Sequence, residues 1–207
     1  NGIVQNLRLN QAKTVENATC TRIGLIAAMN EGTIMNCHVD QSTIHEGVHE
    51  KTGFICGQSS TNGTIINSSA TNNIFNSENS SYVGGLVGYA NSCILNSYTS
   101  KNQYQLNSKS QEAGEIAGYS PSNYHLTISN CYTNNSTSQS AVYAVAPSVK
   151  NASLDHFFYN QGTLYNTGNS TNITKNEVYK HDASFLANGI PVITWMNNWI
   201  DNEGTGT

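Results

Sequence analysis

Apolar residues in this chain fall into short clusters that recur at a nearly constant interval, separated by stretches of Asn, Ser, Thr and Gly. The phrase Gly-Thr-Ile-Met-Asn-Cys-His-Val at 32–39 returns as Gly-Thr-Ile-Ile-Asn-Ser-Ser-Ala at 63–70, about thirty residues later. Every copy has one large aliphatic anchor, and these anchors are Val4, Ile34, Ile65, Ile94, Ile128 and Leu154. A fixed period of this length is typical of proteins in which stacked repeats share one core.

A second phrase alternates with the first and reads Gly, any residue, a large aliphatic residue, a small residue, then Gly or Ala. It occupies 24–28, 53–57, 84–88 and 114–118, with a degenerate copy at 140–144. Because the two phrases recur in strict order, each repeat should be one coil of chain. The final Gly or Ala leaves no side chain where a strand turns tightly or packs closely.

The segments around the anchors are short, rich in β-branched and aromatic residues, and bounded by turn-forming residues. No sustained apolar spacing of three to four residues supports a helical repeat. We therefore predict an all-β fold, a single parallel β-helix (β-solenoid) of about five to six coils over residues 1–160. Ile34, Ile65 and Ile94 should then lie directly above one another.

An Asn column follows the anchors by two positions, at Asn6, Asn36, Asn67, Asn96 and Asn130. The alternation of inward and outward side chains breaks at this Asn, which predicts a bend where Asn adopts the left-handed backbone conformation. Stacked Asn side chains can also bond one another along a solenoid. We predict a structural Asn ladder, with simple turn preference as the alternative.

The segment 161–207 lacks both phrases and should cap the same domain, since a solenoid must cover its open end. Residues 174–177 resemble a capping box, which predicts a helix ending at Asn188-Gly189. Residues 191–195 should then form a short strand. The side chains expected on the last coil are Phe185, Leu186, Ile193, Trp195 and Trp199. The chain opens at Asn1 inside a repeat phrase, so we expect a longer chain that continues the stack N-terminally.

Composition narrows the partners of this 207-residue chain. Hydrophobic residues make up 37% and charged residues 11%, with a net charge of −4. The nine Lys and Arg are scattered, which argues against nucleic acid as a partner. No apolar run is long enough to span a membrane in this segment.

The five cysteines give no metal or disulfide pattern. Cys37 and Cys131 share a column but lie three coils apart, on the order of 14 Å, which is too far for a disulfide. The remaining cysteines, Cys20, Cys56 and Cys93, fall in different columns. We expect buried free thiols that behave as small hydrophobic residues.

His45, Glu46 and His49 match H-E-x-x-H, the zinc metallopeptidase motif. That chemistry needs both histidines on one face of a helix. The stretch lies in a connector without a helical pattern and Gly47 disfavours a helix, so we interpret the motif as a chance match and expect no metal. A zinc peptidase stays as the alternative.

Parallel β-helices also carry polysaccharide lyases and hydrolases, whose carboxylates converge from neighbouring coils. Here Asp40 aligns with Asn10 and Thr71, and Asp155 aligns with Ser129, so the acids do not stack. We therefore predict no catalytic residue, no cofactor and no enzyme activity.

One predicted outward column contains aromatic residues on successive coils, Tyr98, Tyr132 and Phe158. Exposed flat rings suit a sugar or a protein partner, which makes this strip the candidate ligand-contact site. The alternative, which we favour, is that the rings stack on one another or pack under the cap, because aromatic ladders stabilise sheets.

The phrase Gly84-Gly85-Leu86-Val87-Gly88, alternating with phrases such as that at 32–37, resembles the GLUG repeat family over nearly the whole chain. The close at 188–195 also resembles the end of such arrays in bacterial surface proteins. Glu115 and Ala141 depart from the naming motif. The resemblance implies a β-solenoid from a large secreted or surface-attached bacterial protein, as in adhesins and the non-catalytic parts of immunoglobulin-A-specific metallopeptidases.

Together these observations predict a non-enzymatic extracellular or cell-surface module of a bacterial protein, acting as an adhesin, an interaction surface or a rigid stalk. Its partner would be a host or cell-surface glycan or protein. The alternative function is a carbohydrate-binding or carbohydrate-processing β-helix.

Overall fold

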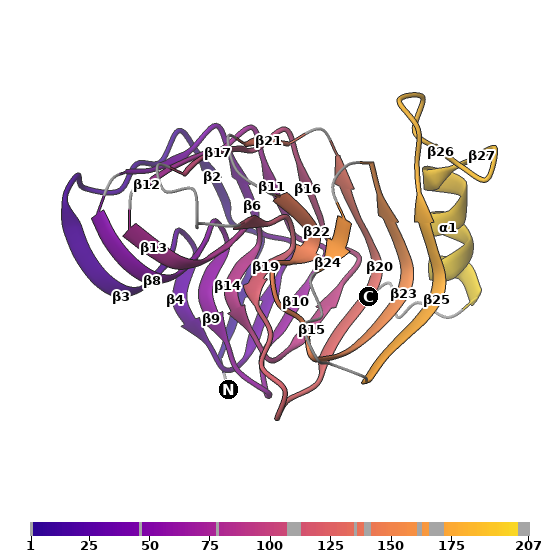
Figure 1. The fold of residues 1–207 in the computed structure, drawn as a ribbon, viewed down its shortest axis with the longest axis horizontal. Coiled ribbons are helices and arrows are strands. Elements are labelled where there is room, and N and C mark those ends of the chain that lie inside the picture. Colours follow the sequence, from indigo (N-terminus) through magenta and orange to yellow (C-terminus); the bar gives the residue numbers. More distant parts are fainter. Residues whose placement is uncertain are drawn as a thin grey trace.

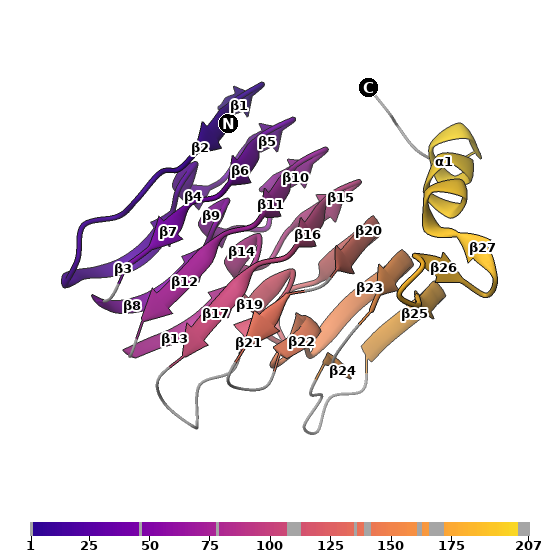
Figure 2. The same cartoon turned by 90° about the horizontal axis from the view of Figure 1, so that it is seen from above.

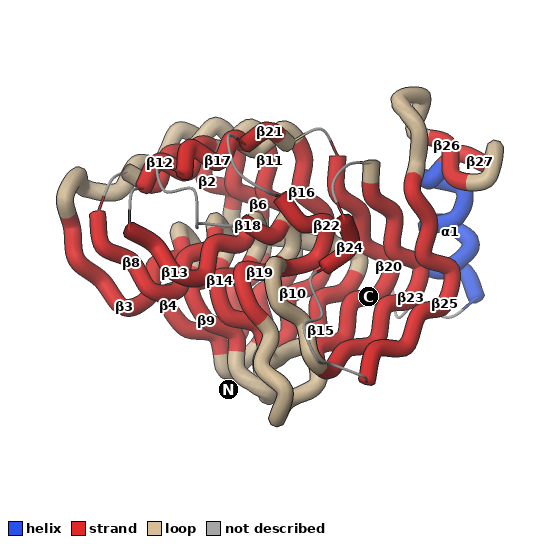
Figure 3. The backbone as a smooth tube through the Cα atoms, in the orientation of Figure 1, coloured by secondary structure: helices blue, strands red, loops and turns tan. Residues whose placement is uncertain are grey.

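The computed structural model describes residues 2–45, 47–77, 79–106, 113–134, 136–138, 142–160, 163–165 and 172–202. The chain winds into a β-solenoid of about five turns, built from parallel stacked sheets with a short helix at its C-terminal end (Figures 1 and 3). The predicted fold class is therefore confirmed. Seen from above, the first repeat and the helix lie at opposite ends of the stack (Figure 2).

Sheet A contains the repeat phrase with the anchors. Each early coil contributes two short strands to this sheet, joined through the Asn position. Each later coil contributes one unbroken strand. Its strands are β1 (Ile3–Gln5), β2 (Arg8–Asn10), β5 (Thr33–Met35), β6 (His38–Asp40), β10 (Thr64–Ile66), β11 (Ser69–Thr71), β15 (Cys93–Leu95), β16 (Tyr98–Ser100), β20 (Leu126–Asn134), β23 (Asn151–Tyr159) and β25 (Asn172–Lys180).

Three further sheets complete the coils in the middle of the stack. Sheet B contains β7 (Thr43–Ile44), β12 (Ile74–Ser77), β17 (Gln103–Leu106) and β21 (Thr137–Ser138). Sheet C contains β3 (Ala18–Gly24), β8 (Gly47–Gly53), β13 (Asn79–Gly84), β18 (Ala113–Gly114), β22 (Val142–Ala146) and β24 (Thr163–Tyr165). Sheet D contains β4 (Ala27–Asn30), β9 (Cys56–Ser59), β14 (Val87–Ala90) and β19 (Ala117–Tyr119).

The stacking register is the one that the repeat predicts. Ile65 pairs with Ile34 on one side and with Ile94 on the other. These anchors are almost completely buried, because the inward faces of all coils share one apolar core. A thin core of this kind needs few apolar residues per coil, which fits the modest hydrophobic content of the chain.

The Asn column forms the predicted bend in the left-handed region. Its members have φ values between 46° and 58°, and they are Asn6, Asn36, Asn67, Asn96 and Asn130. His156 holds the next place in the column with φ 47°. Any residue other than Gly is strained in this region, and Asn is among the least strained.

Side-chain hydrogen bonds run along the Asn column. The Nδ2 of Asn36 donates to Oδ1 of Asn6 at 2.7 Å. Asn96 donates to Asn67 at 2.5 Å, and Asn130 donates to Asn96 at 3.0 Å. The ladder stops at Asn130, whose buried Oδ1 has no partner, since the next coil places His156 in the column.

A second left-handed column, which the sequence analysis missed, lies between sheets A and B. It consists of Gln11, Gln41, Asn72 and Lys101, with φ values between 49° and 58°. Each left-handed residue turns the amide of its successor out of the regular ladder. Both bends therefore need an additional hydrogen-bond acceptor for that amide.

The next coil supplies this acceptor from a buried polar side chain. After the Asn bend, Cys37 N donates to Ser68 Oγ and Ser68 N donates to Ser97 Oγ, both at 3.1 Å. After the second bend, Ser42 N donates to Asn73 Oδ1 at 2.8 Å and Asn73 N donates to Asn102 Oδ1 at 3.0 Å. These buried columns explain how a polar sequence fills an interior without leaving the bend amides unpaired.

The glycine phrase forms the sharp bend between sheets C and D. A Cβ on Gly84 would collide with the carbonyl of Val87, and one on Gly114 would collide with the carbonyl of Ala117. Neither glycine has a positive φ. The bend therefore requires glycine for space, not for backbone conformation.

The C-terminal segment reverses the predicted order of helix and strand. Residues 172–180 form β25, which pairs in register with β23, so the predicted helix there is wrong. Asn188-Gly189 forms the turn of a hairpin between β26 (Leu186–Ala187) and β27 (Ile190–Pro191), with φ values of 51° and 75°. Asn-Gly is the preferred pair for this two-residue turn, and here it does not end a helix.

The helix α1 (Val192–Asn202) occupies the region where a strand was predicted. It begins directly after Pro191, and its apolar residues at 192, 195, 196 and 199 follow helical spacing. Phe185 and Trp195 pack against sheet A as predicted, whereas Ile193 is 58% exposed.

All five cysteines are free. Cys37, Cys56 and Cys131 are buried, but Cys20 and Cys93 are exposed, so the prediction of buried thiols is wrong for these two. The thiols of Cys37 and Cys131 also belong to the polar column: the Sγ of Cys131 donates to Ser129 O at 3.2 Å and accepts from Ser97 N at 3.4 Å.

Candidate functional site

The predicted aromatic strip lies on the outward face of sheet A. Tyr98 and Tyr132 are register partners, and their rings stack in parallel with centroids 4.6 Å apart and planes 5° apart. Both rings are partly exposed. Phe158 is completely buried, so the prediction of a solvent-facing position is wrong for this residue.

The C-terminal cap covers one end of this strip. The ring centroids of Trp195 in α1 and Phe158 lie 6.3 Å apart. Phe185 meets the ring of Tyr132 edge-on, with the centroids 5.1 Å apart. Burial, and then the neighbouring Tyr98, raise the pKa of Tyr132 above its usual range. Phe158, Ala187, Val192 and Met196 form a second small core outside the solenoid. The favoured alternative therefore describes the strip, because Tyr98 and Tyr132 stack on each other while Phe158 and part of Tyr132 pack under the cap.

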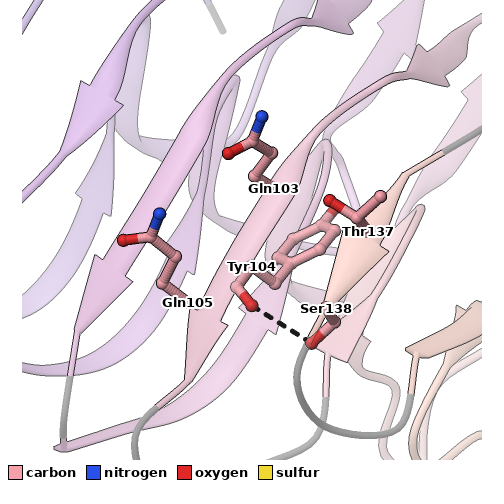
Figure 4. A pocket seen from close by; sticks show the side chains of 5 residues that line it. All are labelled: Gln103, Tyr104, Gln105, Thr137 and Ser138. Atoms are coloured by element: carbon pink, nitrogen blue, oxygen red, sulfur yellow. Dashed lines mark hydrogen bonds between the residues drawn. The ribbon is translucent and has the colours of Figure 1, made fainter.

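A surface pocket of ≈ 250 Å³ opens on sheet B (Figure 4). It is lined by Gln103, Tyr104 and Gln105 of β17 and by Thr137 and Ser138 of β21. Ser138 Oγ donates to the Tyr104 carbonyl at 3.1 Å, while the ring of Tyr104 is buried in the core. The pocket therefore presents amides and hydroxyls, with neither a charged group nor an exposed aromatic face.

A second aromatic group, which we call the tyrosine cluster, lies beside the glycine bend. It consists of Tyr82 on β13, Tyr89 on β14 and Tyr119 on β19. The ring centroids of Tyr82 and Tyr119 are 4.8 Å apart, and those of Tyr89 and Tyr119 are 5.3 Å apart. All three rings are partly exposed.

The tyrosine cluster forms because the glycine bend lets sheets C and D approach closely. A Cβ on Gly118 would meet the backbone of Tyr82 and Val83 in the preceding coil. The residue after this glycine, Tyr119, and its register partner Tyr89 then lie beside Tyr82. Sequence analysis missed the cluster because its members come from both sides of the bend, although Tyr89 and Tyr119 do share a column.

Two cations lie beside the tyrosine cluster. Arg22 and Lys51 are register partners in sheet C, one coil apart. Arg22 Nε donates to Gln58 Oε1 at 2.7 Å, and Lys51 Nζ donates to the same oxygen at 3.3 Å. Lys51 Nζ also lies 4.8 Å from the centroid of the Tyr89 ring, a cation–π distance.

Of the H-E-x-x-H stretch, residues 47–49 lie in an extended strand. His49 lies in strand β8, and its buried Nε2 contacts the backbone oxygen of His45 at 3.3 Å. This confirms the prediction of a connector without a helix, while Glu46 lies outside the described residues. Among the described residues, no three His, Cys, Asp or Glu side chains come together as metal ligands.

Several acidic side chains are engaged in structural hydrogen bonds. Asp40 Oδ1 accepts from Thr71 and Asn72 of the next coil. Burial raises the pKa of Asp40, but these hydrogen bonds and the charge of Arg8 outweigh it and leave the pKa below its usual value. Asp155 accepts from Asn176 at 2.6 Å and from Trp199 of the cap at 3.0 Å.

Glu115 is the buried acid of the core. Its Oε2 accepts from Ser136 at 2.9 Å, from Thr99 at 3.0 Å and from Tyr104 at 3.4 Å. Glu115 takes the place in the second phrase where the preceding coil has Gly85, and a Cβ on Gly85 would meet the Tyr104 hydroxyl. The departure from the repeat phrase thus serves packing and hydrogen bonding inside the solenoid.

Within the described part of the chain, no helix has the length and hydropathy needed to cross a bilayer. Comparison of the chain with protein-family models, characterised proteins and solved structures gives no match. The resemblance to GLUG repeats therefore stays a prediction.

Proposed function

We propose that the chain is a non-enzymatic module of a bacterial surface or secreted protein, in which it serves as a rigid stalk or an interaction surface. The observation that carries this proposal is the unbroken in-register pairing of sheet A from β1 through β25. Such a stack can carry a mechanical force along its axis through main-chain hydrogen bonds, and it presents equivalent side chains at regular intervals.

The polar ladders support the proposal further. Asn and Ser side chains, which occupy catalytic positions in many enzymes, here form columns in which they bond one another or the backbone of the adjacent coil. Three of the described acids, Asp40, Glu115 and Asp155, accept hydrogen bonds from structural partners. A glycosidase would require two converging carboxyl groups.

Carbohydrate binding is the second candidate function, and the exposed part of the aromatic strip favours it. Tyr98 and Tyr132 stack with nearly parallel rings at the surface. Tyrosine rings of this kind provide apolar faces with polar edges, which suit the faces of sugar rings.

Two measurements test the proposal. Antibodies against residues 1–207 should label intact cells that produce the protein, without permeabilisation. Purified chain incubated with a broad panel of neutral and acidic glycans should release no product detectable by mass spectrometry. Labelling that requires permeabilised cells, or turnover of any glycan, would overturn the module proposal.

A binding assay on the same panel separates the stalk from the carbohydrate-binding alternative. If the aromatic strip is a site, Tyr98→Ala should lose binding of a neutral oligosaccharide while Tyr98→Phe retains it. Binding that survives in Tyr98→Ala would exclude the strip as the site.

A further inference from the structure

We propose that the tyrosine cluster, together with Arg22 and Lys51, binds an acidic glycan. In this site a sugar ring lies against the exposed parts of the Tyr119 and Tyr89 rings. The carboxylate or sulfate of the sugar then lies between the guanidinium of Arg22 and the ammonium of Lys51. This inference rests on the proposed function, because it assigns a ligand class to the interaction surface.

The aromatic half of the site is already assembled. Tyr82, Tyr89 and Tyr119 contact one another at centroid distances of 4.8 to 5.8 Å. Burial is the main cause that raises the pKa of Tyr89, and Tyr119, Tyr82, Tyr124 and Glu50 add to the rise in that order. Tyr124, in the segment that follows β19, is 41% exposed. Because neighbours hold the rings, binding would cost little side-chain entropy.

The charged half of the site places two like charges side by side. Arg22 and Lys51 are paired across adjacent strands, which lie about 4.8 Å apart. Like charges in this arrangement destabilise a sheet unless an anion or acceptor compensates them. Their shared acceptor is the neutral amide oxygen of Gln58.

The nearby carboxylate compensates this charge only in part. Glu50 lies 3.5 Å from Lys51 Nζ, with 48% of its side chain exposed. Among the described residues, Arg22 forms no ion pair. An incoming anion would therefore find two positioned donors that already converge on one oxygen.

Charge and geometry favour an acidic glycan over other anions. The chain has a net charge of −4, which disfavours a continuous polyanion such as nucleic acid. Two cations match one acid group, and the adjacent rings match the apolar face of the same sugar unit. Lys51 Nζ lies 4.8 Å from the centroid of the Tyr89 ring, so one monosaccharide can contact both the ammonium and the edge of the aromatic cluster.

The experiment uses the 207-residue chain and three acidic probes, each beside its uncharged counterpart. The probes are an oligogalacturonate with its methyl ester, sialyllactose with lactose, and a heparin tetrasaccharide with its desulfated, carboxyl-reduced form. Titration calorimetry should detect at least one acidic probe, bound at least about tenfold more tightly than its counterpart. Binding should weaken as salt is raised.

Variants then assign the site. Tyr119→Ala should weaken binding of the acidic probe at least about tenfold, whereas Tyr119→Phe should retain it. Arg22→Gln and Lys51→Gln should each remove most of the preference for the acidic probe and leave affinity for the neutral probe unchanged. Lys13→Gln, which removes an exposed cation outside the site, is the matched control for the charge variants and should bind as wild type. Far-UV circular dichroism and thermal unfolding confirm that each variant is folded.

The inference is wrong if no acidic probe binds, if the neutral counterparts bind equally well, or if folded Arg22 and Lys51 variants keep the preference. Equal binding of duplex DNA would replace it with a general anion surface. Each of these outcomes leaves the module proposal intact, because that proposal fails on product formation or on labelling that needs permeabilised cells.

Discussion

The solenoid turns its chain at two kinds of bend that differ in what they require of a side chain. At the Asn bend of sheet A, the backbone adopts the left-handed region and the amide side chains bond from coil to coil. At the glycine bend between sheets C and D, the backbone is ordinary and the neighbouring chain lies too close for a Cβ. One bend is restricted by conformation and the other by space.

This difference shows that turn-forming residues in a repeat are not interchangeable. Asn tolerates positive φ and adds a hydrogen bond, so the Asn bend is stabilised by the residue it contains. Glycine at 84 or 114 has no side chain to make contacts, and its lack of a Cβ lets the bend close and the neighbouring coil approach. Substitutions should therefore affect the glycine bend much more than the Asn bend.

The largest effect is expected at the glycine bend. Gly114→Ala would place a Cβ against the carbonyl of Ala117 and the backbone of the next coil. We expect a loss of at least about 3 kcal/mol in the free energy of unfolding, measured by urea denaturation, because the obstacle is backbone that cannot move aside. Gly2→Ala is the control, since nothing lies within 4 Å of its added Cβ. A loss below about 1 kcal/mol in Gly114→Ala would remove the distinction between the bends.

An intermediate effect is expected in the buried polar column behind the second left-handed bend. Asn102→Ala removes the oxygen that accepts from Asn73 N and the amide that donates to Ala70 O, both in the preceding coil. We expect a loss of about 2 kcal/mol, because two buried backbone groups lose their partner. Gln103→Ala, next in sequence but exposed, should change stability by less than about 0.5 kcal/mol. Equal losses in the two variants would contradict a structural role for this column.

The smallest effect is expected at Cys131, which holds the place that Ser68 and Ser97 hold in earlier coils. The free energy of unfolding of Cys131→Ser at pH 7 should lie within about 1 kcal/mol of the wild-type value, because a hydroxyl can make the same bonds to the Ser97 and Ser129 backbone.

The same variant should alter stability in alkali. Burial raises the pKa of Cys131 to about 12 from 9.0, so the unfolded chain ionises first as the pH rises. The protonated Cys131 thiol therefore makes its full contribution to the free energy of unfolding below pH 9, and this contribution declines as the pH approaches 12. Denaturation at pH 7 to 11 should show a shallower decline in Cys131→Ser than in wild type, and an unchanged slope would contradict burial of this thiol.

The sequence predicted the stacking register because the anchors repeat without ambiguity. Ile34, Ile65 and Ile94 pair as expected, and the parity break at Asn predicted the left-handed bend. Outside the repeats, the prediction of secondary structure depended on single local motifs. Two of these predictions were wrong, the capping box at 174–177 and the helix end at Asn188-Gly189. The capping-box pattern at 174–177 lies in a strand because β23 offers a paired edge, so tertiary pairing outweighs the local preference.

The candidate sites were less accessible to sequence reasoning. Alternation placed Phe158 outside, and it does project outward, but α1 covers it from a segment with no repeat phrase. The tyrosine cluster joins residues on both sides of a bend, so no single column contains it. The polar columns were hidden for a similar reason, because Ser and Asn look like surface residues until their acceptor role is known.

The buried Asn and Ser columns also give the stack a direction. Asn73 and Asn102 each accept from an amide of the preceding coil and donate to one of its carbonyls, through Val39 O and Ala70 O. The bend amides of these coils are thus paired only once the following coil has formed. On a ribosome, the newest of these turns would still lack the acceptors for its bend amides.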